Sequence, residues 1–401
     1  MNTPNRRISL ETVLVLVLCA GFLFTAFYGI SFFLAPDEVA SLRKARMSLG
    51  ELVAYLPYDG HVPLYYMLLH PILDLIGNAQ LMLRLVSVFF YFLSAGALCL
   101  LCKELWRDRT ATLWALALFL VSNSLQDVAH FGKMYTLVLF LGIVAGTLFI
   151  KLLKERRVLL LLPWTLLCVT GTFIHPLFLY YVPAHFLAYV VLEKDNRLRL
   201  AFAAACLVSL APYCLIWLPI SLVQVKNGSL DWIHPTTAKT VFLTVGRIFG
   251  WPGSLGIMAL LLVVGIGRWK NKTLGKWAPE MLGDRLFLSL ALPVLATFGA
   301  MLAVTFFVKP TMGPARYLVL IAFPLAACAV MAIRSHAARK PLTLLVMAMI
   351  VASMASLALE REHRAVRLTG TDAVPTVRAA IIHEPNPMLA VLVFQDHAPV
   401  Q

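Results

Sequence analysis

The sequence predicts an all-α, polytopic membrane protein, and three properties of the chain support this. Hydrophobic residues make up 60% of the 401 residues and charged residues only 13%, whereas soluble domains are about 45–50% apolar and about 25% charged. Apolar runs of membrane-spanning length recur along the chain. Lysine and arginine outnumber aspartate and glutamate by 34 to 20, as expected where helix ends face anionic lipid. These properties exclude a soluble enzyme, a disordered protein and a disulfide scaffold.

About eleven apolar segments have the length that a membrane-spanning helix needs, roughly 17–25 residues. They are residues 10–34, 83–103, 111–126, 133–153, 158–174, 175–192, 200–222, 248–268, 285–308, 317–333 and 341–359. The first is longer than the core of a signal peptide, so we expect it to be retained. A further apolar run, residues 62–77, is short and contains two prolines, a histidine and an aspartate. We expect it to be a re-entrant or interfacial helix in the first outer loop.

The distribution of positive charge predicts the orientation. If residues 62–77 do not span, about 20 of the 34 lysines and arginines lie in the predicted cytoplasmic segments, and if they span, about 13 do. The positive-inside rule therefore favours a cytoplasmic N-terminus and a first outer loop at residues 35–82. We expect one membrane domain, residues 1–359, and a short periplasmic tail, residues 360–401, with a possible strand at Leu389–Phe394. The compact loops suggest a bacterial inner membrane.

Two adjacent acids, Asp37 and Glu38, follow Pro36 directly after the first predicted helix. Asp37 in this position could simply cap the next helix. A carboxylate at the lipid–water boundary is also partly desolvated, which makes it a better base. Asp59, His61 and Tyr65 near the end of the same loop read as interfacial belt residues by composition alone. For the two acids and for these three residues alike, the functional alternative is that they belong to a site at the outer face of the membrane.

Four basic side chains fall at the same predicted outer face, namely Arg84, Lys133, His175 and Arg316. Each could be a snorkelling anchor. Because this face disfavours cations, their grouping indicates a bound anion, of which phosphate is the obvious one. The chain has no P-loop, no dinucleotide fingerprint and no metal-spaced histidine or cysteine set. Nucleotide cofactors and a dedicated metal site are therefore not expected, and no basic run with interleaved aromatics indicates a nucleic-acid partner.

Six short motifs follow one another along the chain. They are Asp37-Glu38, DGHVPLYYMLLH (59–70), LRLVSV (83–88), KMYTLVLFL (133–141), TFIH (172–175) and RYLVLIAFP (316–324). With these motifs the chain resembles, from residue 10 to about residue 335, the membrane glycosyltransferases of the C-type (GT-C) fold. The similarity is to the protein O-mannosyltransferase and aminoarabinose-transferase group (glycosyltransferase family 39-like), which uses polyprenyl-phosphate sugars. Two departures are Val62 in place of a proline and Lys133 in place of an arginine, which keeps the charge but loses the bidentate fork.

The resemblance implies transfer of a sugar, with inversion, from a polyprenyl-phosphate donor to an acceptor at the outer face. Asp37 would be the general base, and Glu38 would position Asp37 or contact the sugar. The donor phosphate would be bound by Lys133, Arg84, Arg316 and His175. The acceptor side would be lined by Asp59, His61 and Tyr65. No obligatory metal is implied, although the acids of the first outer loop could bind a divalent ion.

Other functions remain open from the sequence. A lipid or sugar transporter or flippase would also have many spans, but it should show internal repeats and polar residues in mid-helix, and no clear repeat is present. A polymerase or ligase of envelope polysaccharide would use a lipid-linked oligosaccharide instead. A non-catalytic scaffold would tolerate alanine at Asp37 and Glu38. The partners expected for a transferase are membrane lipids, the lipid-linked donor and an envelope glycan, lipid or protein acceptor.

Overall fold

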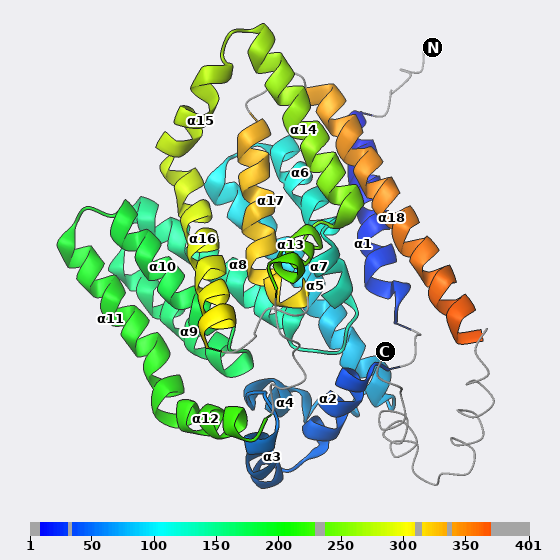
Figure 1. Cartoon of the computed structure of the whole chain (residues 1–401), viewed down its shortest axis with the longest axis vertical. Helices are drawn as coiled ribbons and strands as arrows, with labels where there is room; N and C mark the ends of the chain where they lie inside the picture. Colours follow the sequence, from blue (N-terminus) through cyan, green and yellow to red (C-terminus); the bar gives the residue numbers. More distant parts are fainter. Residues whose placement is uncertain (1–8, 31–33, 229–236, 309–314, 335–338, 370–401) are drawn as a thin grey trace, which may run out of the picture.

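The computed structural model describes residues 9–30, 34–228, 237–308, 315–334 and 339–369. All regular elements in these ranges are helices, as predicted (Figure 1). The longer ones are α1 (Leu10–Tyr28), α5 (Ala79–Leu105), α8 (Tyr135–Glu155), α11 (Asn196–Pro212), α14 (Gly250–Lys270), α16 (Arg285–Phe307), α17 (Val319–Ile333) and α18 (Arg339–Thr369). The shorter ones are α6 (Arg109–Leu120), α7 (Asn123–Ala129), α9 (Leu161–Ile174), α10 (Phe178–Leu192), α12 (Leu218–Lys226), α13 (Ala238–Gly246) and α15 (Leu274–Gly283).

The chain is a multi-pass membrane protein. Within the described residues, eight helices are long and apolar enough to cross a membrane, or nine if α6 and α7, which are bent by 70°, form one span. Shorter apolar helices at Val158–Ile174 and Phe178–Leu192 occupy the other two predicted segments. The all-helical membrane fold is thus confirmed, whereas the number of eleven spans stays a prediction. Side chains such as Leu207, Leu262 and Leu295 are exposed on the bundle surface, where lipid would cover them.

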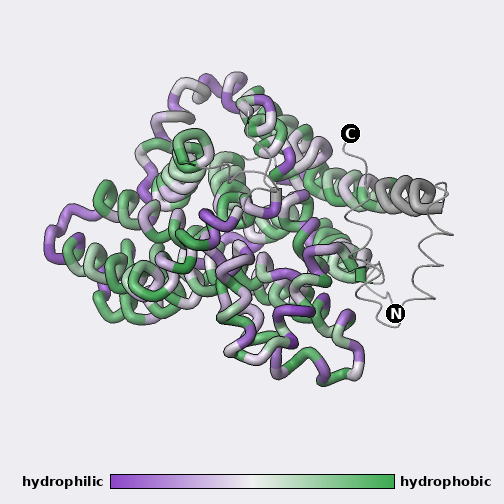
Figure 2. The backbone as a smooth tube through the Cα atoms, turned by 60° about the horizontal axis from the view of Figure 1, so that its bottom comes forward, coloured by the Kyte–Doolittle hydropathy of each residue, from purple (hydrophilic) through white to green (hydrophobic). Residues whose placement is uncertain are grey.

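Several predicted boundaries differ from the structure. The first helix ends at Tyr28, with Gly29 as its C-cap, rather than at residue 34. The last helix continues past the predicted end at residue 359 to Thr369, so the first ten residues of the predicted tail are helical. The rest of the tail, including the possible strand Leu389–Phe394, lies outside the described residues. Figure 2 shows that hydrophobic residues dominate the helices and that hydrophilic residues gather in the connecting segments.

The first outer loop folds into a small cap of short helices at one end of the bundle (Figure 1). Its elements are α2 (Pro36–Arg46), α3 (Leu49–Tyr55), the 3₁₀ turn η1 (Leu56–Tyr58) and α4 (Leu64–Leu69). The apolar run 62–77 contributes only the six-residue α4 and the turns after it, which is far short of the ~20 residues that a span requires. The described helices of the cap are therefore too short to cross a membrane, and their place on the outer side stays a prediction.

Ion pairs join the loops that were predicted to be cytoplasmic. Glu104 pairs with Lys151 and Lys154 across α5 and α8. Glu193, buried after α10, pairs with Arg156 and Arg285. These contacts gather basic loops that are distant in sequence, as the positive-inside argument expects, although the orientation itself stays a prediction.

Helices α8 and α17 pack closely. This packing positions the site because Lys133 lies two residues before α8 and Arg316 lies three residues before α17. A Cβ atom on Gly142 would lie 2.4 Å from the terminal methyl of Leu320, so a larger residue here would have to displace the Leu320 side chain. The carbonyl of Gly142 also accepts a hydrogen bond from the Tyr181 hydroxyl of α10, at 2.7 Å. The α8–α17–α10 contact therefore fixes the starts of two helices whose preceding residues carry cations.

Candidate functional site

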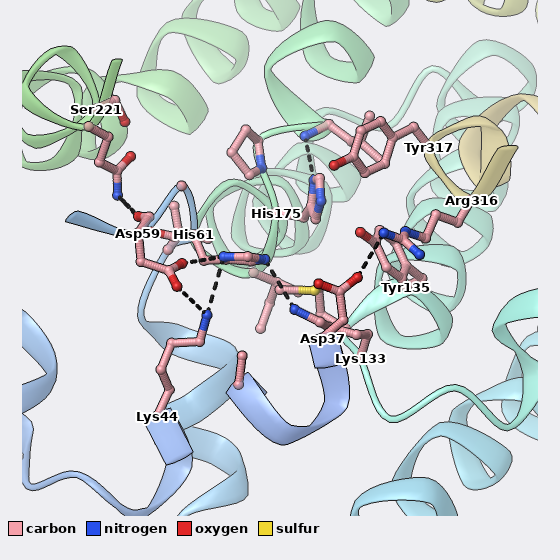
Figure 3. A pocket seen from close by; sticks show the side chains of 18 of the residues that line it. Asp37, Lys44, Asp59, His61, Lys133, Tyr135, His175, Ser221, Arg316 and Tyr317 are labelled. Atoms are coloured by element: carbon pink, nitrogen blue, oxygen red, sulfur yellow. Dashed lines mark hydrogen bonds and ion pairs between the residues drawn. The ribbon is translucent and has the colours of Figure 1, made fainter. Parts of the chain in front are cut away.

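A cavity of about 530 Å³ lies where the first-loop cap meets the bundle (Figure 3). It is bounded by α2, the turn before α4, the segments before α8 and α10, helix α12 and the 3₁₀ turn η4 (Ala315–Leu318). The predicted site residues that line it are Asp37, Asp59, His61, Lys133, His175 and Arg316. Residues far apart in sequence thus meet in one cavity, as the sequence predicted for a site at one membrane face.

Asp37 faces this cavity rather than capping its helix. The N-cap of α2 is Ala35, and the Ala35 N–H is bound by Glu38, not by Asp37. Asp37 Oδ2 instead accepts a hydrogen bond from Arg316 Nη2 at 2.8 Å. The Arg316 guanidinium lies 5.3 Å from the centre of the Phe131 ring. The Asp37 side chain is 43% exposed, so this carboxylate can still be reached from the cavity.

Lys133 is a buried ammonium group that the described structure pairs with no carboxylate. It is only 2% exposed, and its Nζ atom lies 3.3 Å from His61 Nε2. Burial and the nearby charge of Lys44 lower the pKa of Lys133 to about 8. Keeping a cation in such a place is costly unless an anion accompanies it. A negatively charged group in the cavity would offset this cost.

Asp59 orients the histidine that meets Lys133. Asp59 accepts hydrogen bonds from Lys44 Nζ, at 2.7 Å, and from His61 Nδ1. Burial opposes ionisation of Asp59, but the bond from His61 and the charge of Lys44 outweigh it and hold its pKa well below the usual range. Burial and the charges of Lys133 and Lys44 lower the pKa of His61 to about 4. The neutral ring thus donates from Nδ1 to Asp59 and accepts from Lys133 at Nε2.

His175 is a neutral donor rather than a cation. Its Nδ1 accepts the Leu177 N–H at 3.1 Å, which leaves the ring proton on Nε2. Burial, together with the nearby His61, Lys133 and Arg316, lowers the pKa of His175 to about 3. The sequence grouped His175 with the basic residues of this face; burial here favours the uncharged ring, and its role at a phosphate stays a prediction.

Glu38 and Arg84 bind each other outside the cavity lining. Both Glu38 oxygens accept from Arg84, from Nε and Nη2 at 2.8 Å each. They also accept the N–H groups of Ala35 and Gly132 at 2.9 Å. Arg84 Nη1 reaches the Gly29 carbonyl at 3.0 Å. Both side chains are almost fully buried, and the carboxylate has used its acceptor positions. The pair ties α2 and α5 to the segment that carries Lys133.

Tyr65 also differs from its predicted place on the acceptor side. It is 1% exposed and is not among the described residues that line the cavity. Its ring packs edge-to-face on Tyr66, with ring centres 5.6 Å apart. The ring of Tyr66 in turn lies 4.7 Å from Lys44 Nζ. In this position Tyr65 supports the cap through its contact with Tyr66.

The residues present do not fit the divalent ion considered for the first outer loop. Among the described residues, no group of three or more histidine, cysteine, aspartate or glutamate side chains gathers in a metal-binding arrangement. Asp37 and Glu38 diverge to separate arginines. Asp59 is bound by Lys44. These three carboxylates are thus each already paired with a cation.

Lys44 and Gln224 are among the lining residues that the sequence did not predict. Lys44 lies in α2, seven residues after Asp37, and that spacing places two residues on one helical face, so a face-by-face reading of α2 could have found it. Gln224 is a lone amide in the largely apolar helix α12 and is 5% exposed. Nothing in its neighbourhood in the sequence indicated which partners it would meet.

No family model and no curated protein matches the chain, but solved structures resemble it. One is ArnT from Cupriavidus metallidurans in the apo state, with a TM-score of 0.57 and 16% identity over 86% of this chain and 64% of that one. The same protein bound to undecaprenyl phosphate gives 0.56 and 14%, over 96% and 74%. The Archaeoglobus fulgidus oligosaccharyltransferase in complex with zinc and sulfate gives 0.51 and 10%, over 98% and 57%.

These similarities show that the chain has the GT-C glycosyltransferase fold, as the motifs predicted. The chain spans less than two thirds of the length of the apo ArnT and of the oligosaccharyltransferase. At such low identity the likeness establishes the fold alone.

Proposed function

We propose that the chain is an integral-membrane glycosyltransferase that moves a sugar from a polyprenyl-phosphate donor to an acceptor at the outer membrane face. The observation that carries the proposal is Lys133, a buried ammonium group with no described carboxylate partner, in the same cavity as the exposed carboxylate of Asp37. A site of this kind can bind the phosphate of a donor and accept a proton from the acceptor. The GT-C fold supports the same assignment.

Lys133 and His175 are the residues proposed to bind the donor phosphate. Lys133 supplies positive charge, and the neutral ring of His175 supplies an N–H donor at Nε2 without adding a second charge. Arg316 completes the group from η4. Donors fixed in advance around a departing phosphate stabilise the charge that develops in the transition state, which is commonly the largest contribution to such a rate.

Asp37 is proposed as the general base. It would take the proton of the acceptor hydroxyl while the acceptor oxygen bonds to the anomeric carbon. The bond between that carbon and the phosphate oxygen breaks in the same step, and the phosphate leaves with the electron pair. A single displacement of this type inverts the configuration. General-base assistance of this kind contributes about 10²–10⁴-fold.

The remaining predicted residues act through others in this proposal. Glu38 and Arg84 hold the segment before Lys133, and Tyr65 supports the cap. Asp59 and His61 line the same cavity and are proposed to contact the sugar as well as to orient Lys133. An envelope lipid, polysaccharide or protein in the periplasm of a bacterial cell is the proposed acceptor class.

The proposal is tested by sugar transfer in proteoliposomes. Purified protein is given radiolabelled polyprenyl-phosphate sugars together with envelope lipid and protein as acceptors. We expect transfer by the wild type and none by Asp37→Asn. Asp74→Asn is the matched control, since Asp74 lies in the same outer loop and is 81% exposed, and it should transfer normally. Movement of the labelled lipid between leaflets without any transfer would instead identify a flippase and overturn the proposal.

A further inference from the structure

Gln224 of α12 binds the backbone of the turn that carries Asp59 and His61. Its Nε2 atom lies 2.9 Å from the Leu56 carbonyl oxygen, 2.7 Å from that of Asp59 and 2.9 Å from that of His61. Burial of an amide is costly unless it is hydrogen-bonded. Here one buried amide group contacts three carbonyls of the same turn, at residues 56, 59 and 61, which is more than side-chain packing would require.

The sequence places α12 over this turn by interrupting the preceding helix. After α11, residues Tyr213–Trp217 form a π-helix (η3), and Pro212 and Pro219 flank it. Proline lacks the N–H that a regular helix needs, and π-helical turns are frequent at functional sites. Figure 1 shows α12 turned away from the direction of α11 and toward the cap helices α3 and α4. This change of direction between α11 and α12 brings Gln224 to the cavity.

The turn that Gln224 binds links two lysines on different elements, Lys44 and Lys133. Asp59 bonds to Lys44 of α2. His61 meets Lys133, which precedes α8. Because the side chains of residues 59 and 61 project from the backbone that Gln224 binds, a shift of these carbonyls would move His61 Nε2 away from Lys133.

We propose that Gln224 is a positioning residue that holds the 56–61 turn so that His61 meets the Lys133 ammonium, and that it thereby sets the affinity for a polyprenyl-phosphate donor. The inference rests on the proposed function, because it assigns a phosphate to Lys133. Gln224 acts through the turn and through His61, without touching the reacting atoms.

The test measures binding of undecaprenyl phosphate to the purified full-length protein in detergent. Gln224→Met keeps the length of the side chain and removes its donor, so we expect binding about tenfold weaker. Gln224→Glu replaces the donor by oxygens that repel the three carbonyls and should bind more weakly still. Asn227→Ala is the matched control, because Asn227 bonds the same turn at Pro57 from an exposed position, at 3.2 Å. It should bind within about twofold of the wild type.

A double-mutant cycle separates positioning from general support. If Gln224 acts through His61, Gln224→Met should weaken binding little in a His61→Leu protein, because the contact it orients is already gone. An undiminished loss in the His61→Leu protein would overturn the inference. Should Gln224→Met fail to fold, Gln224→Asn takes its place: the shorter amide remains polar but cannot reach all three carbonyls, and it should bind with intermediate affinity.

The outcomes distinguish this inference from the proposed function. If the wild type does not bind undecaprenyl phosphate, or if Lys133→Met binds it as well as the wild type does, the proposed function fails. If Lys133→Met loses binding while Gln224→Met, Gln224→Glu and Gln224→Asn keep it, only the positioning role is wrong.

Discussion

Arg316 Nη2 lies 2.8 Å from Asp37 Oδ2, although 279 residues separate the two in the chain. The contact joins the start of α2 to η4, directly before α17. It also means that the proposed base is bound by a cation that the donor phosphate could attract instead. A donor that draws Arg316 toward its phosphate would release the Asp37 carboxylate for the acceptor hydroxyl.

The first prediction concerns the planar guanidinium group of Arg316. Arg316→Lys keeps the charge but loses the planar group that lies 5.3 Å from Phe131 and 5.7 Å from Tyr135. We expect sugar transfer to fall about 10–100-fold, measured as kcat/KM for the donor. Arg247→Lys, at an exposed arginine, should transfer at the wild-type rate. Equal activity of Arg316→Lys and wild type would show that a point charge suffices here.

The second prediction concerns pH. With a pKa lowered to about 8 by burial and by Lys44, Lys133 loses its proton as the pH rises through that value. Loss of the charge weakens phosphate binding, so the affinity for undecaprenyl phosphate should be highest below pH 8 and fall above it. Lys133→Arg stays charged up to about pH 12 and should lose the fall in affinity near pH 8. Binding titrations across about pH 6–10 measure both curves, and a flat wild-type curve would contradict the assignment.

The third prediction separates support from chemistry at Glu38. Both partners of the Glu38–Arg84 pair are buried, so Glu38→Leu alone or Arg84→Met alone leaves an unpaired buried charge at a cost of ~3–5 kcal/mol. We expect a large drop in melting temperature for each single variant. The double variant Glu38→Leu/Arg84→Met should recover part of it, because no charge is left unpaired.

A different outcome would restore the direct role that the sequence suggested for Glu38. If Glu38→Gln kept the wild-type melting temperature and still abolished transfer, Glu38 would have to act on the substrate. Thermal unfolding and transfer assays on the same preparation decide between the two.

Much of this fold follows from local patterns. Runs of apolar residues located the helices, and Pro176 made a break between α9 and α10 predictable, since proline does not continue a helix. The gathering of Asp37, Lys133 and Arg316 at one end followed from positive-inside counting combined with the order of the motifs. These patterns depend only on neighbours in the chain and on the bilayer.

The misplaced residues depend on tertiary contacts instead. Whether Arg84 faces a ligand or a carboxylate is decided by the rotation of α5 against α2, which a sequence of mixed apolar residues does not specify. His175 was predicted as a cation because its burial could not be seen. The position of Gln224 at the cavity depends on the bend after α11, and no local pattern predicts the direction of that bend.

The last prediction tests His175 as a neutral donor. Its ring lies between Tyr135 and Tyr317, with ring centres 5.4 Å and 5.8 Å away. His175→Phe keeps this packing and removes the Nε2 donor, so binding of undecaprenyl phosphate should weaken about tenfold. His175→Gln can still donate and should retain more affinity, and His70→Gln, at an exposed histidine of the outer loop, should bind normally. Because burial lowers the pKa of His175 to about 3, no titration near the usual histidine value of about 6.5 should disappear in His175→Phe. If one did disappear, or if His175→Phe bound as well as the wild type, the neutral-donor role would be wrong.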